Sequence, residues 1–129
     1  MILDELIEKI KQGRNIMILG NDVDKISDFY SKLNKETENY KDNYYINNFL
    51  NVPIDRKRKF VNEFNKNKKH SYLILLKTKL KMPNKYFEFN IYNFLENEFE
   101  ENIEIANTFS KFDCFYMIGD NYTYFVNEK

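Results

Sequence analysis

Hydrophobic side chains recur at helical spacing over the first ten residues and predict an amphipathic helix. The apolar positions are Ile2, Leu3, Leu6, Ile7 and Ile10. Gly13 follows where a helix C-cap is expected, and the apolar run at residues 15–19 predicts a short strand. Residues 20–22 then turn the chain, and Asp22 or Asp24 can cap a second helix. The inward face of that helix contains Val23, Ile26, Phe29, Tyr30 and Leu33.

The middle of the chain alternates polar connections with apolar segments. Residues 34–43 are polar and predict a loop, whereas residues 44–50 fit either a short strand or a helix. Pro53 suits the first turn of a following helix. The inward positions of this helix are Phe60, Val61 and Phe64. After a polar break at residues 65–69, the continuous apolar run at residues 71–76 is typical of a central strand buried on both faces.

The pattern in the last third of the chain predicts a helical segment followed by a β-hairpin. Residues 86–89 are a further strand candidate. A helical face, in one piece or two, contains Ile91, Phe94, Leu95, Phe99, Ile103, Ala106 and Phe109. Residues 114–118 and 122–126 are two apolar runs joined by a Gly-Asp-Asn turn, which predicts a β-hairpin. The expected fold is α+β with an α/β-like start: a mixed sheet of four or five strands flanked by helices, in one domain spanning residues 1–129.

The composition of the chain indicates where in the cell the protein is found. At 129 residues the chain is long enough for one hydrophobic core. Cys114 is the single cysteine, which excludes an intramolecular disulfide and suits a reducing environment. Acidic residues near the start, including Asp4 and Glu5, argue against a secretory signal, and the longest apolar run, residues 72–76, is too short to span a bilayer. We therefore expect a soluble, cytoplasmic protein with no membrane contact.

The charge in the chain is sorted into blocks although its total is zero. Residues 56–85 contain 11 Lys or Arg against one acid, Glu63. Residues 86–129 contain nine acids against Lys111 and Lys129. If folding keeps these blocks apart, a neutral protein presents two strong fields of opposite sign, and such fields select binding partners.

No motif predicts catalysis or a cofactor. Residues 20–27 lie between a strand and a helix, where a phosphate-binding loop would be, but the second glycine is missing and Asp22 and Asp24 would repel phosphate. His70 is the only histidine, so a catalytic triad or a two-histidine zinc site cannot form. We expect no enzyme activity, no cofactor and no metal.

The basic block is one candidate binding surface, and its partner would be nucleic acid. Its candidate contacts are Arg56, Lys57, Arg58, Lys59, Lys66, Lys68 and Lys69. Tyr72 and Tyr86 flank the block and can stack on bases. The neutral total argues against a dedicated nucleic-acid domain, which usually has a high pI. Cations late in a helix also have a structural role, because they complement the helix dipole.

The acidic block is the second candidate, and its partner would be a basic protein. Its candidate contacts are Glu96, Glu98, Glu100, Glu101, Glu104, Asp113 and Asp120, with Tyr116, Tyr122 and Tyr124 as aromatic anchors. A protein that blocks a nucleic-acid-acting enzyme gains association rate by presenting the field opposite to that of the enzyme. The alternative is a solvated helix face that maintains solubility.

Residues 46–126 resemble the SUKH superfamily of immunity proteins. The matching stretches are residues 46–50, Val52-Pro53, Phe60-Val61 with Phe64, residues 96–104, residues 115–120 and Tyr124-Phe125. The resemblance implies a non-catalytic protein that neutralises a toxin, often a nuclease.

These observations favour a non-enzymatic inhibitor of a nucleic-acid-acting enzyme. A toxin-neutralising immunity protein and a phage-type anti-defence inhibitor, such as an anti-CRISPR protein, fit equally well, because both need only a charged docking face with aromatic residues. The alternative is a small nucleic-acid-binding module that uses residues 56–85.

Overall fold

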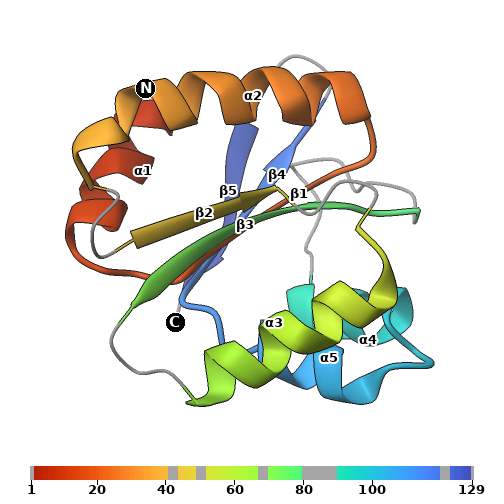
Figure 1. Cartoon of the computed structure of the whole chain (residues 1–129). Helices are drawn as coiled ribbons and strands as arrows, with labels where there is room; N and C mark the ends of the chain where they lie inside the picture. Colours follow the sequence, from red (N-terminus) through yellow and green to blue (C-terminus); the bar gives the residue numbers. More distant parts are fainter. Residues whose placement is uncertain are drawn as a thin grey trace.

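The described residues form one five-stranded sheet with helices on both faces (Figure 1). The computed structural model describes residues 2–40, 44–48, 52–66, 70–79, 90–119 and 123–128. The strands are β1 (Ile16–Gly20), β2 (Tyr44–Asn48), β3 (Ser71–Lys77), β4 (Cys114–Ile118) and β5 (Thr123–Glu128). The helices are α1 (Ile2–Lys11), α2 (Val23–Glu36), α3 (Ile54–Lys66), α4 (Ile91–Glu98) and α5 (Ile103–Phe109), with a 3₁₀ turn, η1, at Glu38–Tyr40.

The sheet confirms the predicted mixed fold and extends its α/β character. The strand order is β2-β3-β1-β4-β5. The first four strands in this order are parallel, and β5 returns antiparallel to β4 as the predicted C-terminal hairpin. The apolar run predicted as a buried strand is β3, which pairs with β2 on one side and β1 on the other.

This strand order decides which helices share a layer. The chain moves outward from β1 to β2 through α2, and then back inward from β2 to β3 through α3. Because parallel crossovers are right-handed, reversing the direction of travel moves the connection to the other face of the sheet. The step from β3 past β1 to β4 continues in the same direction, so α4 and α5 join α3 (Figure 1).

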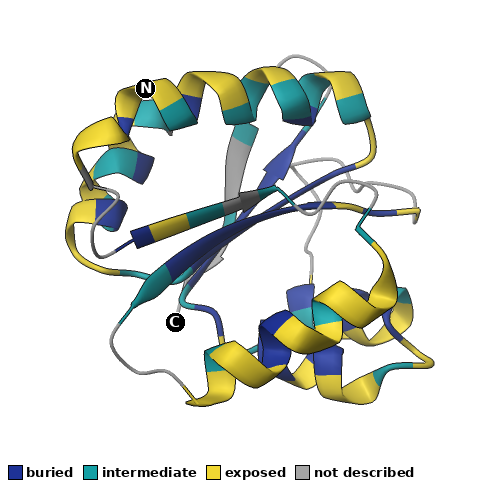
Figure 2. Ribbon diagram, viewed as in Figure 1, coloured by how far each residue is buried: buried dark blue, intermediate teal, exposed yellow. Residues whose placement is uncertain are grey.

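Two apolar cores fill the two sides of the sheet, and the outer faces of the helices are exposed (Figure 2). Successive side chains of a strand point to opposite faces. In β4, Phe115 and Met117 therefore pack toward α3, α4 and α5, whereas Tyr116 packs toward α1 and α2. The aromatic residues lie mainly in the core between the sheet and the layer of α3, α4 and α5. There Phe109 contacts Phe112 with a centroid distance of 6.0 Å.

Local details agree with the sequence in some places and differ in others. Gly13 ends the first helix with a φ of 71°, as a C-cap requires. The prediction of a loop at residues 34–43 is partly wrong, because α2 continues to Glu36. The hydroxyl of Thr37, the residue after the helix, donates a hydrogen bond to the Leu33 carbonyl over 2.7 Å. The strand candidate at residues 86–89 lies outside the described residues. With 14 residues, α2 is the longest helix described, and no helix in these ranges is long and apolar enough to cross a membrane.

Candidate docking face

The predicted acidic helix is two helices joined by a tight connection. Asn90 caps α4, because its side-chain oxygen accepts from the backbone N–H groups of Tyr92 and Asn93 at 3.0 and 3.1 Å. α4 ends at Glu98 with Phe99 as its C-cap, and the buried Phe99 ring packs on Phe109 with a centroid distance of 5.4 Å. The Asn102 N–H then donates to the Phe99 carbonyl over 2.8 Å, and α5 begins. With the Phe99 ring buried, Glu96, Glu100 and Glu101 on either side of it are exposed, whereas Glu98 is partly buried.

Four glutamates on and beside this connection are exposed, and together we call them the acidic turn. They are Glu96, Glu100, Glu101 and Glu104. Among the described residues none of the four makes a hydrogen bond or an ion pair. None of the four charges is therefore neutralised by a direct ion pair within the described part of the chain.

Glu98 has a different role from the one predicted. It is partly buried and points to the end of β3, where it accepts from the Thr78 hydroxyl at 2.8 Å and from the Lys79 backbone N–H at 3.3 Å. Thr78 is itself buried, and its N–H donates to the Gly20 carbonyl over 2.8 Å. Glu98 therefore joins α4 to the sheet, which occupies the carboxylate that was predicted to contact a partner.

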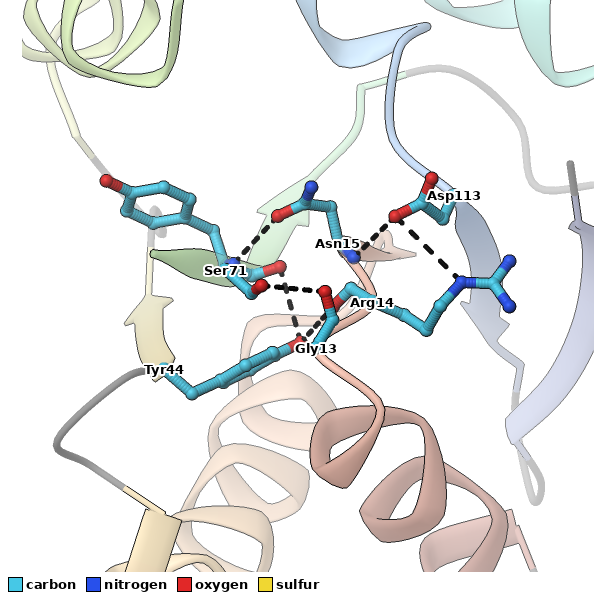
Figure 3. A network of polar contacts seen from close by, with 7 residues as sticks. Gly13, Arg14, Asn15, Tyr44, Ser71 and Asp113 are labelled. Atoms are coloured by element: carbon cyan, nitrogen blue, oxygen red, sulfur yellow. Dashed lines mark hydrogen bonds and ion pairs between the residues drawn. The ribbon is translucent and has the colours of Figure 1, made fainter. Parts of the chain in front are cut away.

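Asp113, which was predicted to contact a partner, does not lie at the acidic turn. It lies at the amino ends of the parallel strands, in the polar network that Figure 3 shows. Its carboxylate accepts from the Asn15 N–H at 2.8 Å and lies 4.0 Å from Arg14 Nε. Asn15 in turn accepts from the Tyr72 N–H at 2.9 Å through its side-chain oxygen (Figure 3). Asp113 thus satisfies backbone groups where β1 and β4 begin, and its assignment to the docking face is wrong.

Asn15 was not predicted, and it supports a stability prediction. Replacing it with alanine leaves the N–H of Tyr72 unpaired where β3 begins, so Asn15→Ala should lower the unfolding free energy by about 1–3 kcal/mol. Urea unfolding measures this loss. The matched control is Asn107→Ala on the exposed side of α5, which should change stability by less than about 0.5 kcal/mol. Equal effects for the two variants would contradict a structural role for Asn15.

Tyr44 completes this network and predicts a pH dependence. Its hydroxyl donates to the Arg14 carbonyl over 2.8 Å (Figure 3). Burial, followed by the charges of Cys114 and Asp113, holds the pKa of Tyr44 well above its usual value of 10.0. A raised folded-state pKa contributes stability that is complete below pH 10.0 and is lost as pH rises through the folded value. Tyr44→Phe should therefore flatten the alkaline loss of unfolding free energy, and an unchanged alkaline slope would contradict this prediction.

Tyr116 is not a surface anchor. It is fully buried on the α1 side of the sheet, the side opposite α4 and α5, and its hydroxyl donates to Glu5 Oε1 over 3.1 Å. The prediction that it contacts a partner is wrong, because alternation along β4 places it on the other face. Tyr124 lies on β5 opposite Met117. Asp120 and Tyr122 lie outside the described residues.

The basic block lies beside the acidic turn rather than apart from it. Arg56, Arg58, Lys59 and Lys66 are exposed on α3, and Lys68 and Lys69 lie outside the described residues. Arg58 Nη2 donates to Asn102 Oδ1 over 3.0 Å, which ties the start of α3 to the start of α5. The condition for two separate fields is therefore not met in the described part of the chain: α3, α4 and α5 form one layer whose surface carries both signs.

Lys57 is the one member of the predicted basic set that turns inward within the described part of α3. It is half-buried, and its Nζ lies 5.7 Å from the centre of the Phe99 ring. Burial lowers the pKa of Lys57, while the charge of Glu98 opposes and that of Lys79 adds to the effect. Its ammonium group lies over the Phe99 ring beside the acidic turn, in the geometry of a cation–π contact.

The turn between β1 and α2 is stabilised by Asp22, which caps the N-terminus of α2. The Asp22 carboxylate accepts from the N–H groups of Asp24 and Lys25 at 2.9 and 3.2 Å. A Cβ added at Gly20 would lie 2.9 Å from Ile26 Cγ1, so this glycine allows β1 to pack closely against α2. Two of the N–H groups that a phosphate would need at this helix start are therefore already paired. Within the described ranges no group of three His, Cys, Asp or Glu residues could hold a metal ion.

Comparison with known proteins adds no family to this geometry. No protein-family model, curated protein or solved structure matches the chain. The resemblance to SUKH immunity proteins stays a prediction from the sequence.

Proposed function

We propose that this protein is a non-catalytic inhibitor that binds a basic, nucleic-acid-acting enzyme through the acidic turn. The observation that carries the proposal is the set of four exposed glutamates without a charge partner in the described residues. Uncompensated surface charge steers association with a partner of opposite sign. Enzymes that act on nucleic acid present basic surfaces, because they must contact phosphates.

Two settings fit this proposal. One is an immunity protein that neutralises a toxin nuclease, and the resemblance to the SUKH superfamily supports it. The other is a phage-type anti-defence inhibitor. Both place the protein in the cytoplasm, where the single buried Cys114 stays reduced.

The arrangement of α3 beside α5 favours a protein partner over nucleic acid. Arg58 at the start of α3 is tied to Asn102, which directly follows Glu100 and Glu101. A phosphate backbone that approached this end of the basic block would meet these carboxylates at close range. A protein can instead match both signs, and the paired fields would favour one orientation of docking.

The test is capture followed by an activity assay. The wild-type chain and a variant with Gln at Glu96, Glu100, Glu101 and Glu104 are immobilised and exposed to lysate from the native host or its phage. We expect the wild type to retain a basic enzyme that the variant loses, and the purified enzyme to stop cleaving or binding nucleic acid when the wild-type chain is added. A retained protein with no action on nucleic acid, or equal retention by both chains, would contradict the proposal.

A further inference from the structure

Ile103 is the most exposed large hydrophobic residue in the described part of the chain. It is 56% exposed at the start of α5, and the structure describes its neighbours without a gap from residue 90 to residue 119. The acidic turn flanks it in the sequence, with Glu100 and Glu101 before it and Glu104 directly after it. An apolar side chain that the protein itself does not bury thus lies among exposed carboxylates.

Ile54 is a second exposed hydrophobic residue, and it lies on the side of α3 that faces α5. It is 38% exposed at the first position of α3. Arg58 and the buried Val61 are four and seven residues later, so the three side chains share one face of the helix. Arg58 donates to Asn102, the residue directly before Ile103. Ile54 therefore continues the inward face of α3 beyond the core, beside the contact that joins α3 to the start of α5 (Figure 1).

The arrangement of these residues has the anatomy of a protein–protein interface. Large hydrophobic residues that are exposed singly are normal on any surface. Here two of the three among the described residues lie beside one contact between helices, and the charges of the acidic turn flank that contact. An apolar centre with a charged rim is typical of protein interfaces, in which a few central residues supply most of the affinity.

The charges on this rim select the kind of partner. A second copy of the chain would bring two sets of four exposed glutamates together, and like charges at close range cost affinity. A phosphate backbone would meet the same repulsion. A basic protein would instead place Lys and Arg against the glutamates, and apolar side chains between them would bury the two isoleucines.

We propose that Ile103 and Ile54 form the apolar anchor of the docking face, and that the partner covers them with apolar side chains set among Lys and Arg. The inference rests on the proposed function, because the acidic turn brings the same partner to the same face. It places the anchor on α3 and α5 rather than at Tyr116, which is buried on the opposite side of the sheet. The glutamates then set the rate of association, and the isoleucines set the lifetime of the complex.

Methyl NMR with two synthetic peptides tests the chemistry of the anchor. One peptide alternates pairs of lysine with pairs of leucine, and the other replaces every leucine with serine. The leucine peptide should shift the Ile103 methyl signal and bind about tenfold more tightly, because its apolar side chains remove that of Ile103 from water. Equal binding of the two peptides would overturn the proposal. A shift of the Ile103 signal with protein concentration alone would also overturn it, because a second copy would then cover the anchor.

Matched variants, each checked for its fold by circular dichroism, separate failure of the anchor from failure of the acidic turn. Ile103→Ser should weaken binding of the leucine peptide about tenfold. Tyr45→Ser, which removes the third exposed hydrophobic residue, on β2, should leave it unchanged. The variant with Gln at the four glutamates should bind both peptides more weakly. If Ile103→Ser binds like the wild type while the Gln variant does not, the anchor is wrong and the acidic turn stands; if the Gln variant binds like the wild type, the docking face itself is wrong.

Discussion

Tyr116→Ala should lower the unfolding free energy by about 3–5 kcal/mol, the range measured for truncating fully buried aromatic side chains. Tyr116 is 0% exposed between β4 and the α1–α2 layer. The loss includes the cavity left by the ring and the hydrogen bond to Glu5. Domains of this size are stable by only about 5–15 kcal/mol, so the variant should be largely unfolded at moderate urea concentrations.

Tyr116→Phe is the matched control. It keeps the ring and removes only the bond to Glu5, so it should cost about 1 kcal/mol. Because Tyr116 faces away from α4 and α5, the folded Phe variant should bind the partner with wild-type kinetics. If Tyr116→Ala unfolds like the wild type but releases the partner faster, the residue lies in an interface and not in a core.

Reversing the four charges of the acidic turn to Lys should slow association with a basic partner by about 10- to 100-fold at low ionic strength, within the range that electrostatic steering supplies. The expected effect is large because α3 already places Arg56, Arg58 and Lys59 in the same layer, so the reversal gives this layer a large positive net charge. The difference should shrink at physiological salt, where the Debye length is about 8 Å.

The same reversal should leave the fold intact. The four side chains are exposed and make no described hydrogen bond or ion pair, and exposed charges contribute at most about 1 kcal/mol each to stability. Glu98 must be kept, because it holds Thr78 and Lys79 at the end of β3. Circular dichroism and urea unfolding of the variant verify that slower association is not caused by unfolding.

The strongly periodic segments of the fold could be predicted from the sequence. β1, β3 and β4 are continuous apolar runs because each is buried on both faces. The helical face at residues 91–109 was also predicted, but whether it formed one helix or two stayed open. β2 could not be assigned, because an edge strand is apolar on one face only and five residues are too few to separate its pattern from that of a helix.

The roles of individual acidic residues could not be predicted, because they depend on contacts between distant segments. Asn15 and Asp113 are 98 residues apart, and Thr78 and Glu98 are 20 apart. No local pattern distinguishes these structural carboxylates from the four of the acidic turn. The proximity of the basic and acidic blocks could not be predicted either, because it follows from the strand order that places α3, α4 and α5 on one face of the sheet.

The central claim is that the acidic turn, and not net charge, brings the partner to this protein. Stopped-flow association rates with the captured enzyme distinguish an effect of the acidic turn from an effect of net charge. The comparison needs a second variant in which the same change in net charge is made on α2 and η1. That control reverses Asp24, Asp28, Glu36 and Glu38, which are exposed in the structure. We predict that reversing the acidic turn slows association at low salt about 10- to 100-fold, whereas the control associates within about threefold of wild type. Equal slowing by both variants, or no slowing by the first, would contradict the docking face proposed here.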